Sequence, residues 1–132
     1  VLVHDGARPC LSPHCLDRLL DQGLQSPDGA ILGMPVSDTL KQSDDETNIS
    51  GTVSRQGLWS AQTPQLFRVK ALSEAIDAAQ QNGVGLTDEA SAMELVGATP
   101  KLVMGSVGNI KITYPVDLTI AEALLTRNKK NN

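Results

Sequence analysis

The order of segments near the start of the chain constrains the fold most strongly. A short apolar run covers residues 1–3, a helical spacing of leucines covers about residues 13–25, and a second apolar run covers residues 30–36. Ser12 followed by Pro13 is typical of a helix start, because serine caps the first turn and proline is accepted in it. This pattern predicts a right-handed crossover between parallel strands. The first run is expected to be a buried central strand with helices over both faces of its sheet.

Aromatic residues are scarce, with one Phe, one Trp and one Tyr among 132 residues. The core must therefore be built from Leu, Val, Ile and Ala, which favours an α/β fold over a β-sandwich. A domain of this length can bury roughly two thirds of its unfolded surface. A formal net charge of -4 argues against a general nucleic-acid binder, since such proteins need a basic stripe.

The apolar pattern and the cysteine spacing bear on the cellular location and on the state of the thiols. No apolar run approaches the ~20 residues that span a bilayer, and nothing resembles a signal peptide, so we expect a cytoplasmic protein. Cys10 and Cys15 are spaced too widely for a C-x-x-C motif. They are expected to be reduced, structural thiols. The polar tail at residues 127–132 is expected to fray.

The middle of the chain predicts a hairpin. Residues 38–41 and 49–55 flank a polar, charged tip at residues 42–48. An isolated two-stranded ribbon is marginal in water, so this hairpin is expected to pack on its own domain or to reach a partner.

The later elements are predicted from periodicity and caps. Residues 62–67 should be extended, because the residue before a proline avoids the helical region. Helices are expected at residues 69–81, from Thr87 as the cap with two carboxylates in its first turn, and from Pro115. Residues 101–104 predict a strand, and residues 110–113 a short strand or an extended loop. We find no repeat and no linker that would divide the chain.

Asp5, Gly6 and Arg8 follow the first strand, at the end where open α/β sheets bind ligands. Gly6 would let a ligand approach the backbone, Asp5 could orient a hydroxyl or hold a metal, and Arg8 offers a forked donor to phosphate. The alternative is that Asp5 and Arg8 pair across the turn and that Gly6 serves its geometry. These residues alone leave both open. His4 is expected to be a packed or hydrogen-bonded ring rather than a catalyst.

Other polar side chains also allow two interpretations. Hydrogen-bond donors lie around the base of the hairpin, on Thr39, Lys41 and Arg55. Edge strands, however, commonly carry such polar residues for solubility. Thr63 and Thr87 present hydroxyls at junctions between loops and elements. For Thr87 the alternative is the role of helix cap.

Lys111 lies between Ile110 and Ile112 and should point opposite to both if this segment is extended. It either reaches the edge of the sheet or is aimed at an anion.

Five motifs occur together in one order along the chain: His4-Asp5-Gly6-Ala7-Arg8-Pro9, Asp38-Thr39-Leu40-Lys41, residues 55–65, Thr87-Asp88-Glu89-Ala90-Ser91 and Asn109-Ile110-Lys111-Ile112-Thr113. With these motifs the chain closely resembles the 2-C-methyl-D-erythritol 4-phosphate cytidylyltransferases of the non-mevalonate isoprenoid pathway. The resemblance covers residues 1 to about 126. Ribitol- and other polyol-phosphate cytidylyltransferases are the relatives most easily confused with it.

The resemblance implies a Rossmann-like nucleotidyltransferase fold of the nucleotide-diphospho-sugar transferase type, a three-layer α/β sandwich. It also implies a protruding β-hairpin arm at about residues 37–58, through which two copies form a homodimer. The implied reaction joins CTP and methylerythritol phosphate, with Mg²⁺ or another divalent cation, and releases diphosphate.

The resemblance also assigns roles to individual residues. Lys111 and Asp5 match catalytic positions, and Asp5, Gly6 and Lys111 match nucleotide-binding positions. The positions that match substrate-binding residues are Asp5, Arg8, Thr39, Arg55, Thr63, Thr87 and Lys111. Thr39 and Arg55 are expected to serve the other subunit's site. No metal ligand is assigned, because Gly108 stands where members of the family often carry an acidic residue.

The family's Gly-rich loop, which holds the CTP triphosphate, is absent from this sequence. The chain is therefore expected to be the carboxyl-terminal portion of a single cytidylyltransferase domain, inactive by itself. A non-catalytic dimerisation or binding module is the alternative from another class.

Overall fold

The structure is a computed structural model that describes residues 1–130, with side chains for residues 1–127. Its helices and strands, in chain order, are β1 (Leu2–Val3), α1 (Pro13–Gly23), β2 (Ala30–Pro35), β3 (Leu40–Ser43), β4 (Ile49–Val53), β5 (Trp59–Leu66), α2 (Val69–Gln81), α3 (Glu89–Leu95), β6 (Lys101–Met104) and α4 (Pro115–Lys130). α4 continues to Lys130, so the tail predicted to fray is helical up to that residue. The rest of that prediction lies outside the described residues.

The main sheet of the described chain has the strand order β1-β5-β2-β6 and is mixed. β2 and β6 are parallel, whereas β5 is antiparallel to both β1 and β2. β1 and β2 thus run in the same direction, as the crossover pattern predicts, but β5 lies between them. The crossover pattern does not reveal this place of β5, because β5 comes later in the chain.

The strand at the start of the chain, β1, is expected to be a buried central strand of the complete domain, and within the described residues it has a neighbour on one side only, so that expectation stays a prediction. β1 lies at one edge of the sheet, pairs with β5, and leaves Leu2 40% exposed. A short apolar run does not reveal how many neighbours a strand has, because pairing partners are set by distant segments.

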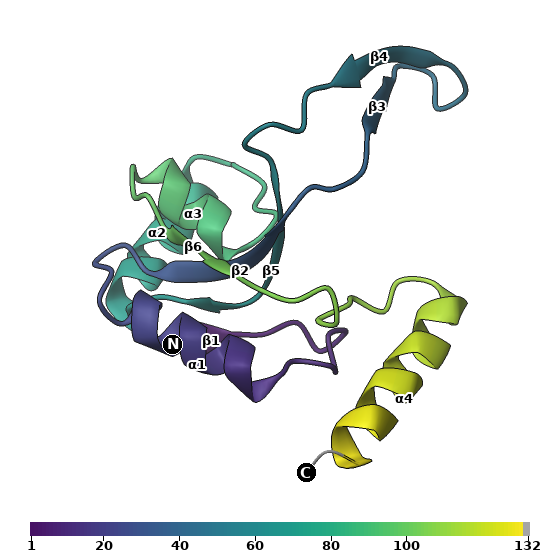
Figure 1. The fold of residues 1–132 in the computed structure, drawn as a ribbon. Coiled ribbons are helices and arrows are strands. Elements are labelled where there is room, and N and C mark those ends of the chain that lie inside the picture. Colours follow the sequence, from purple (N-terminus) through teal and green to yellow (C-terminus); the bar gives the residue numbers. More distant parts are fainter. Residues whose placement is uncertain (131–132) are drawn as a thin grey trace.

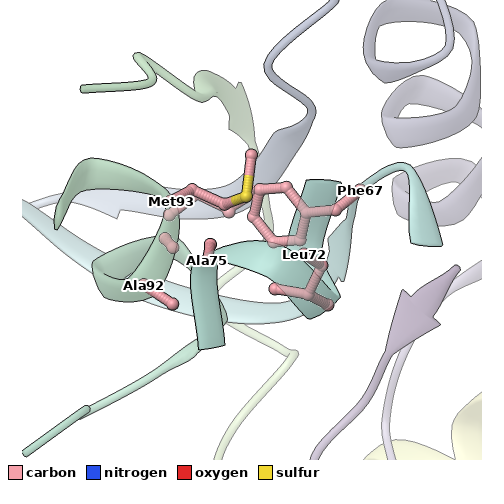
Figure 2. Packing of buried hydrophobic residues seen from close by; sticks show 7 residues of the cluster. Phe67, Leu72, Ala75, Ala92 and Met93 are labelled. Atoms are coloured by element: carbon pink, nitrogen blue, oxygen red, sulfur yellow. The ribbon is translucent and has the colours of Figure 1, made fainter. Parts of the chain in front are cut away.

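Helices cover both faces of the sheet, which gives the predicted three layers (Figure 1). On one face, Leu19 of α1 packs with Leu32 and Val103 in a fully buried cluster. On the other face, Phe67 and Met93 are buried against α2 and α3 (Figure 2). Neighbouring residues of β2 alternate between these two clusters, since successive strand side chains point to opposite faces.

The predicted helices form, with one correction. Ser12 caps α1 by accepting a hydrogen bond from the Cys15 backbone N–H, and α2 has the predicted bounds. α3 begins at Glu89 with Asp88 as its cap, so the prediction of Thr87 as the cap is wrong. Asp88 is the cap because its carboxylate accepts the Ser91 backbone N–H, while the Ser91 hydroxyl oxygen accepts the Asp88 backbone N–H.

The predicted hairpin is present as a separate two-stranded sheet of β3 and β4. It projects from the body on two extended connections that leave β2 and return to β5 (Figure 1). Ile49 and Val53 on it are 67% and 39% exposed. We call the hairpin and its connections, about residues 37–58, the arm.

Three smaller expectations concern the rest of the chain. Residues 110–113 lie in a loop and form no strand. Cys10 and Cys15 are buried, free thiols, as predicted. Among the described residues, no helix is both long and apolar enough to cross a membrane.

Candidate active site

A cavity of about 460 Å³ opens where β1 ends beside β5. Its lining comes from four distant segments, namely the loop after β1, the strand β5, the start of α3 and the loop before α4. The lining residues are Val3, His4, Asp5, Arg8, Ala61, Gln62, Thr63, Gln65, Thr87, Asp88, Glu89 and Lys111. Five of the predicted site residues therefore meet here, which are Asp5, Arg8, Thr63, Thr87 and Lys111.

An ion pair between Asp5 and Lys111 lies in this cavity. The Lys111 Nζ atom is 3.0 Å from the Asp5 Oδ2 atom, with the two side chains 54% and 29% exposed. The Asp5 Oδ1 atom accepts the backbone N–H of Ala7 at 2.9 Å. The Ala7 N–H and then Lys111 hold the pKa of Asp5 below its usual value of 3.8. The carboxylate is therefore ionised at neutral pH and keeps the ammonium group of Lys111 in the cavity.

Hydrogen bonds connect the loop that carries Lys111 to the loop after β1. The Ile112 N–H donates to the Ala7 carbonyl at 2.8 Å, and the Arg8 Nη1 atom donates to the Asn109 carbonyl at 2.6 Å. The alternative in which Asp5 and Arg8 form a side-chain pair is thus not what the structure shows.

The guanidinium of Arg8 is held mainly by backbone carbonyls. Besides the bond to Asn109, its Nη2 atom is 3.4 Å from the Ala61 carbonyl. The Nε atom of Arg8 is buried and has no partner among the described residues. Arg8 lines the cavity as predicted, but two of its donors already have protein acceptors.

Thr63 connects Asp5 to His4. Its Oγ1 atom accepts the Asp5 backbone N–H at 2.9 Å and lies 3.0 Å from the His4 Nδ1 atom. The His4 Nε2 atom is 3.0 Å from the Arg8 carbonyl, which can only accept. Nε2 must therefore carry the proton, and the Thr63 hydroxyl donates to Nδ1. The prediction of a hydrogen-bonded His4 ring is confirmed.

The start of α3 forms the opposite wall. Asp88 accepts the Ser91 N–H and also the Gln65 Nε2 atom, each at 2.9 Å. Gln65 is 1% exposed and accepts the Ala90 N–H through Oε1. Since Asp88 supplies the cap, the hydroxyl of Thr87 is available to the cavity that it lines.

Sequence reasoning did not assign roles to Gln62, Gln65 or Asn109, and it placed Asp88 in the first turn of the helix rather than at its cap. The usable signal was a pair of amides, Gln62 and Gln65, in the segment that ends with the apolar Leu66 and Phe67, since a buried amide must find partners. Asn109 is fully buried, and its Nδ2 atom donates to the Thr63 carbonyl at 2.8 Å.

Three predicted site residues do not line the cavity in this single chain. Thr39 and Arg55 lie at the base of the arm, where Arg55 donates to the Ser37 carbonyl. Gly6 is exposed beside the cavity, and a Cβ atom built there would meet no atom within 4 Å.

Carboxylates of the cavity do not make a metal site by themselves. The described residues contain no group of three or more His, Cys, Asp or Glu suited to hold a metal ion. Both oxygens of Asp5 and both of Asp88 already accept hydrogen bonds or ion pairs. The described part of the chain therefore does not supply a full set of Mg²⁺ ligands by itself.

Comparison with known proteins decides the family. A family model described as 2-C-methyl-D-erythritol 4-phosphate cytidylyltransferase matches residues 1–127. The chain belongs to this family. A cytidylyltransferase of this name from Halorhodospira halophila is 56% identical over 126 residues, which are 96% of this chain and 52% of the relative. The one from Vibrio parahaemolyticus is 52% identical over 129 residues, which are 98% of this chain and 55% of the relative.

Solved structures of cytidylyltransferases share the fold. The enzyme from Francisella tularensis superposes with a TM-score of 0.88 at 39% identity, over 94% of this chain and 58% of the other. A 4-diphosphocytidyl-2C-methyl-D-erythritol synthase gives 0.85 at 47% identity, over 94% and 55%. The Rossmann-like nucleotidyltransferase fold is thus confirmed. The chain spans about half the length of the curated relatives it matches.

Proposed function

We propose that the family-length cytidylyltransferase containing this chain transfers a cytidylyl group from CTP to 2-C-methyl-D-erythritol 4-phosphate. An oxygen of the sugar phosphate forms a bond to the α-phosphorus of CTP. The bond from that phosphorus to the bridging oxygen of the β-phosphate breaks, and diphosphate leaves with the electron pair. The ion-paired Lys111 in the cavity, within a chain that matches this family over residues 1–127, carries the proposal.

The residues of the cavity have distinct roles in this proposal. Lys111 donates to the phosphate oxygens on which negative charge increases as the bonds exchange. Asp5 keeps that ammonium group in place and, with Gly6, lies beside the nucleotide. Arg8 binds phosphate, and the hydroxyls of Thr63 and Thr87 serve the substrate.

A divalent cation is part of the proposed reaction, where it would neutralise phosphate charge. Mg²⁺ commonly uses one or two carboxylates together with substrate phosphates. The described residues do not supply a full set of ligands on their own, so substrate phosphates would have to provide the others.

We also propose that this chain is the carboxyl-terminal portion of one domain and that its arm reaches a second copy. Thr39 and Arg55 then complete the partner's site. The exposure of Ile49 and Val53 on a thin two-stranded ribbon supports this proposal, because such a ribbon gains stability when it packs on another surface. The cytoplasmic location and the inactivity of the isolated chain stay predictions.

Replacing Lys111 tests the function. In the family-length enzyme, Lys111→Ala should lower turnover by ~10²–10³, because it removes a donor to the transition state. The assay follows diphosphate release with CTP and methylerythritol phosphate, and ribitol phosphate serves as the competing acceptor.

Lys70→Ala is the matched control for this test, since Lys70 is an exposed lysine paired with Glu74 on α2. Near-normal turnover in Lys111→Ala would remove Lys111 from its role. Faster transfer to ribitol phosphate would identify the protein as another polyol-phosphate cytidylyltransferase.

A further inference from the structure

Two amide side chains are buried between β5 and the loop that carries Lys111. Gln62 is 8% exposed and Asn109 is fully buried. The Gln62 Nε2 atom donates to the Ser106 carbonyl at 2.9 Å, and the Asn109 Nδ2 atom donates to the Thr63 carbonyl at 2.8 Å. The two amides also approach each other, with Asn109 Nδ2 3.4 Å from Gln62 Oε1. We call Gln62 and Asn109 the amide clasp.

The two main bonds of the amide clasp run in opposite directions. Gln62 reaches from β5 to the backbone of the loop, and Asn109 reaches from the loop to the backbone of β5. The loop is therefore fixed to the strand at two points, just before Lys111. In addition, the backbone carbonyl of Asn109 accepts the Arg8 Nη1 atom. Asn109 thus contacts Thr63 and Arg8 and lies two residues from Lys111.

The residues around the amide clasp leave room for it, and one of its buried polar atoms has no partner among the described residues. A Cβ atom at Gly105 would collide with the Gln62 side chain, so this position accepts only glycine while Gln62 keeps its place. The Asn109 Oδ1 atom is buried without a partner among the described residues. An unpaired buried polar atom destabilises the fold, and an aliphatic side chain would avoid that cost. Packing alone therefore does not explain an amide at this position.

We propose that Gln62 and Asn109 are positioning residues, which hold Lys111 at hydrogen-bond distance from Asp5 in the cavity. They do not touch the reacting groups themselves. The effect on turnover rests on the function proposed above, whereas the effect on the ion pair does not.

The first test measures the position of Lys111 without using activity. Because Lys111 lowers the pKa of Asp5, that pKa reports how close the ammonium group lies. It is measured by ¹³C NMR of the Asp5 carboxyl group in the family-length protein. Lys111→Met calibrates the contribution of Lys111 against those of the Ala7 N–H and of Arg8, which also act on Asp5. Asn109→Ala and Gln62→Met should each raise the pKa toward the value in Lys111→Met.

Asp28→Ala is the matched control for hydrogen bonding. The Asp28 Oδ2 atom accepts both the backbone N–H and the hydroxyl of Thr99, outside the cavity. Losing these bonds should leave the pKa of Asp5 unchanged. An unchanged Asp5 pKa in both clasp variants would overturn the proposal. If Asn109→Ala does not fold, Gln62→Met decides the outcome, since methionine keeps the length of the side chain.

The second test separates positioning from general damage. Misplacing Lys111 should lower kcat by about tenfold to a hundredfold. The KM for CTP should change by less than about threefold, because binding in the ground state is retained. A rise in KM with kcat unchanged would contradict the proposal. If even the unmodified enzyme transfers no cytidylyl group, the proposed function fails, while the NMR titration still decides the role of the amide clasp.

Discussion

At the scale of single residues, Thr63 shows how one hydroxyl can organise a site. It accepts from the Asp5 backbone and donates to His4, so it fixes the backbone of the residue that pairs with Lys111. A methyl group in place of the hydroxyl would leave the Asp5 N–H without this acceptor. Losing a hydrogen bond at a partly buried donor costs more than the net value of the bond.

Thr63→Val should therefore lower turnover by about tenfold to a hundredfold, whereas Thr63→Ser, which keeps the hydroxyl, should stay within about threefold of the unmodified enzyme. Steady-state kinetics and the NMR shift of the Asp5 amide measure both effects. Thr99→Val removes a hydroxyl that donates to Asp28 outside the cavity, and it is the matched control. Equal losses of turnover in the Val and Ser variants would show that the missing hydroxyl is not the cause of the lower turnover.

The sequence predicted several of these residues but not their partners. Asp5 and Lys111 each stood out from their neighbours, because a charged residue beside apolar ones needs a reason. Their pairing joins two segments that lie far apart in the chain, and no local pattern encodes such a contact. Gln65 was missed because its role is to satisfy Asp88 and the Ala90 N–H, which becomes visible only when α3 is placed against β5.

At the scale of elements, α4 carries in its first turn an acidic residue, Asp117, that fixes the preceding loop. The Asp117 Oδ2 atom accepts the backbone N–H groups of Thr113 and Tyr114 at 2.9 and 2.8 Å. The Tyr114 N–H and then the Thr113 N–H hold the pKa of Asp117 below its usual value of 3.8. The charged form therefore stabilises the start of the helix.

The sign of the pH dependence follows from this lowered pKa. The contribution of Asp117 is fully present above pH 3.8 and is lost as the pH falls through the lowered value. Asp117→Asn should therefore lower the melting temperature of the family-length protein at neutral pH, and the difference should disappear in acid. Melting temperatures of both proteins across the acid range test this, and a difference that persists at every pH would contradict it.

The sequence predicted the bounds of the helices better than the neighbours of the strands. The leucine spacing and the Ser12–Pro13 start were sufficient to predict α1, and the periodicity was sufficient to predict the bounds of α2. These signals are local, so the sequence carries them in full. The place of β1 at the edge of the sheet depends on β5, which comes much later in the chain. For such contacts the apolar pattern indicates a strand but not its neighbours.

At the scale of the whole molecule, the arm would decide, in the proposed dimer, which copy completes a site. In a symmetric dimer whose arms cross, Arg55 of one copy serves the cavity that contains Lys111 of the other. Mixed dimers of Arg55→Ala and Lys111→Ala copies then hold one site with both changes and one site with neither. Two inactive proteins should regain activity when they are mixed.

Random mixing of these two variants should restore about a quarter of the activity of the unmodified enzyme, because half of the dimers are mixed and each has one intact site. The variants are unfolded together, refolded and assayed, with each variant alone as the control. Absence of recovery in mixed dimers, verified by mass spectrometry, would place Arg55 in the site of its own copy.

The cavity also has a consequence for the integrity of the fold. Its walls come from the start of the chain, the middle strand β5, the third helix and the loop before the last helix. A ligand that contacts all four acts as a removable cross-link between segments that are far apart in sequence. Because it binds the folded state, its free energy of binding adds to the stability of the whole arrangement. Substrate supply and resistance to unfolding are thereby coupled in one molecule.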